Sequence, residues 1–208
     1  MRKINKGEPI SSFTEFVNSH HPTRWEDAKD VSRTWREYIL EYEQYQLSGY
    51  TEEPLRAAKS HIDHFRKRSL FNTIAFIFDW NNLIVDSINE TYGAKHKDNI
   101  VKTSKENEKL INPVTEDASR FFKYQINGKI DVADGLCNED IGRAKYTISA
   151  FNLNESSLVE RRRIIMNTII DSYNDLNDET ILDALKTEGF TSVVEQLLKE
   201  RKQREETV

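Results

Sequence analysis

The segment His61-Ile62-Asp63-His64-Phe65 gathers the side chains of this sequence best suited to chemistry. It holds two of the five histidines and a carboxylate within four residues. A carboxylate is a hard oxygen ligand for a divalent cation, and an imidazole is a base that is largely neutral near pH 7. Phosphodiester hydrolysis needs both groups. In an extended strand, His61 and Asp63 face one side and His64 the other. A histidine at a strand end is also often only hydrogen-bonded, so the cluster alone leaves a structural role open.

Two downstream segments place this cluster in a wider pattern. Asp79-Trp80-Asn81-Asn82-Leu83 begins fifteen residues after His64, and Tyr92-Gly93-Ala94-Lys95-His96-Lys97-Asp98 follows. An acid-His pair ending a strand, an Asn-Leu pair and a Lys-containing helix, in this order, resemble the HNH or ββα-metal nuclease motif. With Ile111-Asn112-Pro113, the pattern is most similar to the HNH (PtuB-type) subunit of Septu-type and retron-linked anti-phage systems. The resemblance covers about residues 48 to 132.

This resemblance implies a role for each matching residue. His64 is the general base that takes a proton from the attacking water. Asp63 binds Mg²⁺ or Mn²⁺, which stabilises the charge developing on the phosphate and the leaving oxygen. Asn82 orients the ring of His64, or its loop, by hydrogen bonding. The residues implied in binding nucleic acid are Arg66, Lys67, Arg68 and Lys95, although a solvated loop carries the same residue types.

The metal ligands differ from those of the family in two respects. Many relatives bind structural zinc through two Cys-x-x-Cys pairs, whereas the matching positions here are Ser48, Thr51, Ser87 and Glu90. We therefore expect no structural zinc, and the hairpin must be held by packing of nearby aromatic side chains, chiefly Phe76, Phe78 and Trp80. The usual third ligand to the catalytic metal falls near Thr91, a poor ligand, and His96 is the expected substitute, with Asn89 as an alternative.

Periodicity predicts the elements around this motif. Thr23-Arg24-Trp25-Glu26 reads as a capping box that opens one helix ending near Ser48-Gly49. The apolar run Ile74-Ala75-Phe76-Ile77-Phe78 is predicted to be a strand in a hairpin with the histidine-rich segment. The polar stretch from Asn81 to Asn99 suits a loop and a short helix. Asn127-Gly128 predicts a type I′ turn between the strands Phe121 to Ile126 and Lys129 to Val132.

The last third of the chain is predicted to be helical. The expected helices are Asp140 to Phe151, Glu155 to Leu176, Glu179 to Lys186 and Thr191 to Glu205. Asn154 and Asp178 are the expected N-caps. Apolar stripes are formed by Leu158, Ile165, Ile169 and Tyr173 and by Val193, Val194, Leu197 and Leu198. The predicted fold is α+β and mainly α-helical, with a small zinc-free ββα-metal (HNH) hairpin module embedded between helices: a helical segment 1–47, a nuclease module 48–135 and a helical lobe 136–208.

Composition limits the functional classes. The 208 residues carry a net charge of −5, which argues against a protein that coats nucleic acid over its whole surface. Local basic clusters remain at Arg66-Lys67-Arg68, Lys95-His96-Lys97 and Arg161-Arg162-Arg163. No run approaches the roughly 18 apolar residues of a membrane span, so we expect a soluble, cytoplasmic protein. The single cysteine, Cys137, excludes an internal disulfide.

These observations favour an HNH endonuclease that cuts DNA or a cellular RNA such as tRNA. A degenerate HNH scaffold that acts as an adaptor in the same defence complex is the alternative, and a chance motif in an unrelated helical binding domain is a third. The resemblance implies an ABC-type ATPase (PtuA-like) partner and, for retron-linked members, a reverse transcriptase with RNA-linked DNA. We expect the partner on the helices after Asn138, with Arg161 to Arg163 either at its edge or on a solvated face.

Overall fold

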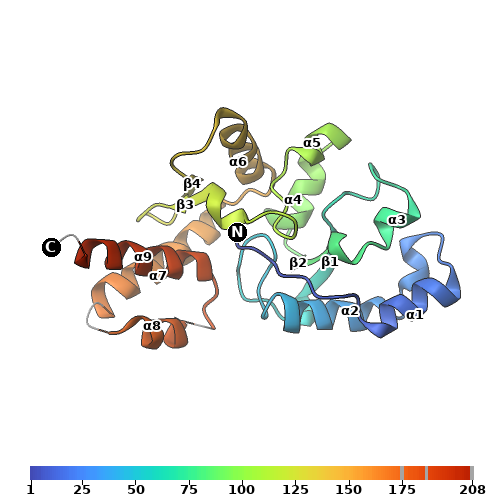
Figure 1. Cartoon of the computed structure of the whole chain (residues 1–208), viewed down its shortest axis with the longest axis horizontal. Coiled ribbons are helices and arrows are strands. Elements are labelled where there is room, and N and C mark those ends of the chain that lie inside the picture. Colours follow the sequence, from blue (N-terminus) through green and yellow to red (C-terminus); the bar gives the residue numbers. More distant parts are fainter. Residues whose placement is uncertain (174–175, 186, 207–208) are drawn as a thin grey trace.

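Helices surround two small antiparallel hairpins in the computed structural model of this chain, which describes residues 1–173, 176–185 and 187–206 (Figure 1). The helices are α1 (Ser11–His20), α2 (Ser32–Tyr38), α3 (Ile74–Ile77), α4 (Gly93–Ile100), α5 (Ser104–Glu108), α6 (Asn138–Ala150), α7 (Ser156–Ser172), α8 (Asp178–Leu185) and α9 (Thr191–Glu205). The strands are β1 (Ser60–His64), β2 (Leu83–Ser87), β3 (Phe122–Tyr124) and β4 (Ile130–Val132). Short 3₁₀ turns lie at Trp25–Ala28, Ala57–Lys59, Trp80–Asn82 and Ala118–Phe121. The fold is therefore α+β and mainly helical, as predicted.

The first hairpin pairs β1 with β2, and this corrects the predicted pairing. Asp63 lies opposite Ile84, and His64 lies opposite Leu83. The apolar run predicted as the partner strand instead forms the helical turn α3, within the loop that joins the two strands. The real partner strand was predicted to be loop. Every residue of β2 is buried, so the strand shows no alternation of polar and apolar residues. The polar pair Asp86-Ser87 at its end makes the strand still harder to predict from the sequence.

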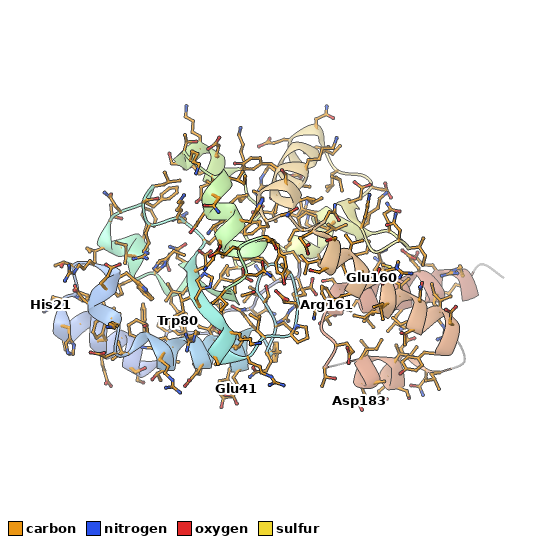
Figure 2. All side chains as sticks on the ribbon, turned by 180° about the vertical axis from the view of Figure 1, so that it is seen from behind. His21, Glu41, Trp80, Glu160, Arg161 and Asp183 are labelled. Carbon is orange, nitrogen blue, oxygen red and sulfur yellow. The ribbon has the colours of Figure 1, made fainter. Side chains whose placement is uncertain are left out.

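Hydrophobic clusters cover both faces of this hairpin. On one face, Phe13 of α1 packs against Trp35 of α2 and against Trp80, with ring centroids 5.0 Å apart in both pairs. Leu83 and Val85 belong to this cluster. Figure 2 shows Trp80 among the side chains of these N-terminal helices. On the other face, Ile84 joins the larger cluster that contains α4 and the C-terminal helices. The hairpin is thus packed on both faces by apolar side chains.

The predicted N-terminal helix is divided into three parts. A 3₁₀ turn at Trp25–Ala28 precedes α2, which continues as a π-helical turn at Ile39–Glu43. The predicted capping box assigns the wrong acidic residue. The carboxylate of Asp27, not Glu26, accepts hydrogen bonds from the amides of Thr23 (2.9 Å) and Arg24 (3.1 Å). The apolar spacing still places Ala28 and Trp35 in the core.

The second hairpin, β3–β4, is where it was predicted, but its turn is of another type. The amide of Gly128 donates to the carbonyl of Gln125 (2.7 Å), and the Gln125 amide donates to Lys129 (2.8 Å). Gly128 has a φ of 84°, whereas Asn127 is not among the residues with positive φ. A type I′ turn needs positive φ at both residues, so this is a three-residue connection ending in a left-handed glycine. A Cβ on Gly128 would also lie 2.1 Å from the carbonyl oxygen of Val159 in α7.

The C-terminal helices follow the prediction, with different caps. Glu155 caps α7 by accepting from the Ser157 amide (2.8 Å), while Asn154 bonds the main chain of Ile130 instead. Asn177 accepts from Thr180 (2.9 Å), so Asp178 is the first helical residue rather than the cap. Residues 174 and 175 and Lys186, parts of two predicted helices, lie outside the described residues. Both predicted stripes are buried or partly buried, with these members: Leu158, Ile165, Ile169, Tyr173, Val193, Val194, Leu197 and Leu198.

One residue of the basic run of α7, Arg162, has a structural role. Arg162 is 2% exposed and donates to the carbonyls of Gly128 and Leu153, each at 2.7 Å. Arg161, next to Glu160 in Figure 2, pairs with Glu53 at 3.0 Å. Arg162 is therefore not part of an accessible edge for a partner. Among the described residues, no helix combines the length and apolar character that crossing a bilayer requires.

Candidate active site

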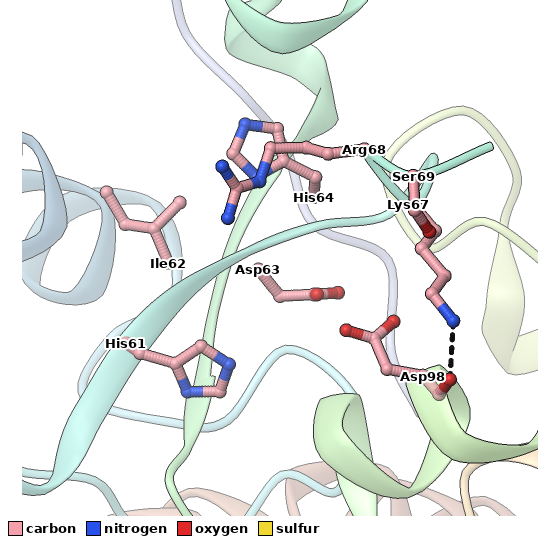
Figure 3. A pocket seen from close by; sticks show the side chains of 8 residues that line it. All are labelled: His61, Ile62, Asp63, His64, Lys67, Arg68, Ser69 and Asp98. Carbon is pink, nitrogen blue, oxygen red and sulfur yellow. Dashed lines mark hydrogen bonds between the residues drawn. The ribbon is translucent and has the colours of Figure 1, made fainter. Parts of the chain in front are cut away.

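A cavity of about 350 Å³ opens where β1 ends (Figure 3). The strand contributes four residues, the loop after it contributes three, and α4 contributes one. The lining residues are His61, Ile62, Asp63, His64, Lys67, Arg68, Ser69 and Asp98. The predicted general base, the predicted metal ligand on β1 and two of the four predicted phosphate-binding residues therefore share one pocket.

His64 is fixed in position and in tautomer. The residue is 4% exposed, and Nε2 lies 2.9 Å from the carbonyl oxygen of Ile77. A carbonyl only accepts, so Nε2 carries the hydrogen and Nδ1 holds the lone pair. The ring forms a T-shaped pair with Trp25, with centroids 4.5 Å apart. Burial lowers the pKa of His64 to about 4, against a smaller opposing effect of Asp63. The imidazole is therefore neutral at pH 7.

Asp63 points to the other face of β1, toward α4. Its Oδ2 accepts from the Tyr50 hydroxyl (2.5 Å) and from the ammonium of Lys97 (2.6 Å). Lys97 is fully buried and also donates to the carbonyl of His64 (3.2 Å). The predicted alternation across the strand is present, and both side chains reach the same cavity because it opens at the strand end. Sequence reasoning missed Lys97, whose charge is typical of a surface residue.

Asn82 acts on the loop between β1 and β2 and does not line the cavity. Its Oδ1 accepts from the amide of Arg66 (2.6 Å), and its Nδ2 donates to the carbonyl of Phe76 (2.8 Å). Its carbonyl accepts from the amide of Phe65 (2.9 Å). Asn82 thereby ties both ends of the loop whose Ile77 carbonyl holds the ring of His64. Asn82 was predicted to orient either the ring of His64 or its loop, and these contacts match the second alternative.

The two basic residues that line the cavity are both engaged. Lys67 donates to the carbonyls of Asp98 (2.5 Å, dashed in Figure 3) and Val101 (3.1 Å) at the C-terminal end of α4. Arg68 pairs with Glu26 at 3.0 Å, and both side chains are exposed. An exposed pair of this kind is weak, so Arg68 is held less firmly than Lys67.

The other two predicted phosphate-binding residues lie outside the cavity. The guanidinium of Arg66 lies 4.6 Å from the ring centroid of Phe76. Lys95 pairs with Glu90 at 3.3 Å, and both side chains are solvent-exposed. The structure therefore does not bring Arg66 or Lys95 to the pocket that holds His64.

The side chains around Asp63 do not fit a divalent cation as they are folded. His96, the second predicted ligand, lies outside the cavity, and its Nδ1 is 2.8 Å from the carbonyl oxygen of Ala150. The ammonium of Lys97 already lies on Oδ2 of Asp63 and 3.4 Å from Oδ1 of Asp98. No group of three His, Cys, Asp or Glu residues with metal-binding geometry occurs in the described part of the chain. The Mg²⁺ or Mn²⁺ site remains a prediction, and we assign no step to it.

The positions predicted to match the zinc cysteines of HNH nucleases take part in hydrogen bonds. The hydroxyl of Ser48 donates to Asp86 and accepts from the amides of Tyr50 (3.2 Å) and Thr51 (3.0 Å). Asp86, fully buried, also accepts from the amide of Ala94 (2.6 Å). Burial raises the pKa of Asp86 to about 7. Sequence reasoning missed Asp86, although an acidic residue directly after the apolar Leu83-Ile84-Val85 was a signal.

Comparisons with known proteins do not identify a family for this chain. No family model matches the sequence, and no curated protein is significantly similar to it. The resemblance to HNH nuclease subunits therefore depends on the motif residues alone, and the site is interpreted from its geometry.

Proposed function

We propose that this chain is an HNH-like endonuclease and that His64 is its general base. The observation that carries the proposal is the fixed ring of His64, whose Nε2 donates to Ile77 and leaves Nδ1 as the proton acceptor in a cavity lined by Lys67 and Arg68. A neutral imidazole beside positive charge is suited to attack on an anionic phosphodiester. The β1–β2 hairpin followed by α4 supports the ββα part of the resemblance.

The reaction derived from these residues is a hydrolysis. A water molecule attacks the phosphorus while Nδ1 of His64 takes its proton, and the bond from phosphorus to the leaving nucleoside oxygen breaks. That oxygen takes a proton from solvent. Arg68 neutralises charge on the phosphate, and Asn82 is a positioning residue that holds the loop carrying the Ile77 carbonyl. A bound phosphate also favours the imidazolium formed in this step.

The proposed substrate is DNA or RNA, tRNA included, and the proposed context is anti-phage defence. The cavity offers few cations for binding a polyanion, since Lys67 is engaged with α4 and the whole chain has a net charge of −5. Substrate binding then depends on a partner. An ABC-type ATPase subunit fits this need, joined in retron-linked systems by a reverse transcriptase and its RNA-linked DNA.

A cleavage assay tests the proposal. The wild-type chain, with its genomic neighbours, is compared with His64→Ala and with the matched control His20→Ala, which changes an exposed histidine of α1. We expect loss of cleavage by 10²-fold or more for His64→Ala, as for other general bases, and none for the control. Equal cleavage by all three proteins would remove His64 from the mechanism.

A second candidate is a non-catalytic scaffold of the same complex. The observation that favours it is the closed ion pair of Lys97 and Asp63, which uses one carboxylate oxygen of the pocket. In this case the wild-type complex assembles and protects cells from phage, and His64→Ala protects equally well. Protection that requires His64 would exclude the scaffold.

A further inference from the structure

The ammonium of Lys97 contacts three of the residues that line the cavity. It lies 2.6 Å from Oδ2 of Asp63, 3.4 Å from Oδ1 of Asp98 and 3.2 Å from the carbonyl oxygen of His64. The ring of Tyr50 adds a fourth contact, with its centroid 5.9 Å away. All four are electron-rich groups arranged around one positive charge, which is the environment that a bound cation requires.

A divalent ion at Asp63 would have to compete with this ammonium. The Lys97 side chain is fully buried, so solvent screens its charge poorly. Two unit charges about 4 Å apart repel by about 4 kcal/mol even at an effective dielectric constant of 20, and a divalent ion doubles that repulsion.

We propose that Lys97 is the resident cation of this pocket, that it excludes divalent metal from Asp63, and that its removal uncovers a divalent-cation site formed by Asp63 and Asp98. In the wild-type chain Lys97 is a positioning residue, since it holds Asp63 against Tyr50 and does not line the cavity. The relevance of this to cleavage rests on the proposed function, but the cation site itself does not.

The two carboxylates that Lys97 contacts support the uncovered site. Oδ1 of Asp98 is buried and has no hydrogen-bond partner in the described part of the chain, and its ion-pair partner is Lys97, 3.4 Å away. Asp98 lines the same cavity as Asp63. Without Lys97, the two carboxylates lose their shared counter-ion. Carboxylate oxygens are suitable ligands for Mn²⁺.

The test measures Mn²⁺ binding by calorimetry and thermal unfolding on the whole chain near pH 7.5. Four variants accompany the wild type: Lys97→Ala, which opens the space; Lys97→Met, which fills it without charge; Asp63→Asn alone; and Lys97→Ala combined with Asp63→Asn. We expect Mn²⁺ to bind Lys97→Ala alone, and the midpoint of its thermal transition to rise with Mn²⁺. At a hundredfold excess over Kd, the ratio of folded to unfolded chain increases about 100-fold.

Each result decides the inference. Binding of Mn²⁺ by the wild type that disappears in Asp63→Asn overturns the exclusion, and a folded Lys97→Ala that binds none overturns the uncovered site. If Lys97→Ala is unfolded alone, Mn²⁺ is expected to refold it, and failure to do so also counts against the site. Cleavage by the wild type, where detected, is expected to persist in EDTA. Absence of all cleavage would contradict the proposed function. The Mn²⁺-binding results would still test the proposal about Lys97, because they do not depend on cleavage.

Discussion

Oδ2 of Asp63 lies 2.6 Å from the ammonium of Lys97, a buried pair that joins β1 to α4 across 34 residues of sequence. The pair sets the direction in which Asp63 points and places α4 over the strand that carries His64. An ion pair in the interior costs desolvation on both sides, so its net contribution to stability is small while loss of one partner is costly. The geometry of the pocket thus depends on both residues together.

Lys97→Met is expected to lower the free energy of unfolding by about 3–5 kcal/mol, because it leaves Asp63 buried without its counter-ion. The double variant Lys97→Met with Asp63→Asn should recover part of this loss, since no charge is then stranded. Urea denaturation measures both. Lys95→Met, on an exposed position of the same helix, is the control and should change stability by less than about 0.5 kcal/mol. Additive effects of the two buried changes would contradict the coupling.

Asp86→Asn is expected to stabilise the protein at pH 8 and to have little effect at pH 4. Burial raises the pKa of Asp86 from 3.8 to about 7. A raised folded-state pKa gives stability that is present below the unfolded value and is lost as pH rises through the folded one. Asparagine stays neutral and still accepts from the Ala94 amide through its oxygen, while its amide nitrogen reverses the bond that the Ser48 hydroxyl donates to Asp86. The gain at pH 8 is up to about 4 kcal/mol.

Denaturation curves of wild type and Asp86→Asn at both pH values provide the test. Asp86→Ala serves as the control, because it removes the hydrogen bonds to Ser48 and Ala94 along with the charge and should be destabilised at both. An equal difference between wild type and Asp86→Asn at pH 4 and pH 8 would show that Asp86 does not titrate between them.

Sequence patterns predicted the helices and strands that bury only one of their faces. The stripe of α7 that includes Leu158 and Ile165 repeats at helical spacing because one face alone is buried. The β3–β4 hairpin is marked by its glycine turn, although the turn type depends on packing of Gly128 against α7. The alternation of Asp63 and His64 across β1 also follows from the sequence alone.

The elements that were missed are those where burial removes the pattern or reverses the expected polarity. β2 is buried along its whole length, so nothing alternates in it. Lys97 and Arg162 are charged residues in the interior that bond to Asp63 and Gly128, each 34 residues away, and no local pattern distinguishes them from surface residues. Long-range pairing of this kind decides the candidate site, and only the three-dimensional structure shows it.

Arg162→Met is expected to destabilise the chain by about 2–4 kcal/mol. It removes two hydrogen bonds of 2.7 Å and leaves the carbonyls of Gly128 and Leu153 buried without a donor. Arg163→Met on the same helix is the matched control, since Arg163 is exposed and pairs only with Glu160 of its own helix among the contacts described. Thermal unfolding of the two variants is compared. Similar losses in both would contradict the structural role of Arg162.

Asn82→Ala is expected to loosen the loop of residues 65–79 while the remaining fold persists. The substitution removes the bonds to Arg66 and Phe76, so the Ile77 carbonyl no longer holds the ring of His64 in place. Limited proteolysis should cut this loop faster in the variant, and cleavage of nucleic acid should fall with little change in far-UV circular dichroism. Asn81→Ala, at the exposed neighbouring position, is the control. Equal proteolysis of the two would argue that Asn82 does not order the loop.

The pH dependence of stability tests the state of His64 directly. Burial lowers its folded-state pKa to about 4, below the unfolded value of 6.5. Between these values the unfolded chain binds a proton that the folded chain does not, so the free energy of unfolding falls as pH falls from 6.5 to 4. The full loss is about 3 kcal/mol. His64→Gln should lack this part of the slope, while His61, whose pKa is also lowered by burial, contributes equally in both proteins.

If the protein is a nuclease, kcat/KM should stay constant from pH 7 down to about 5, since kcat/KM reports the pKa of the base in the free enzyme. An acidic limb near pH 6.5 would mean that the ring of His64 is solvated, contrary to its contacts with Ile77 and Trp25.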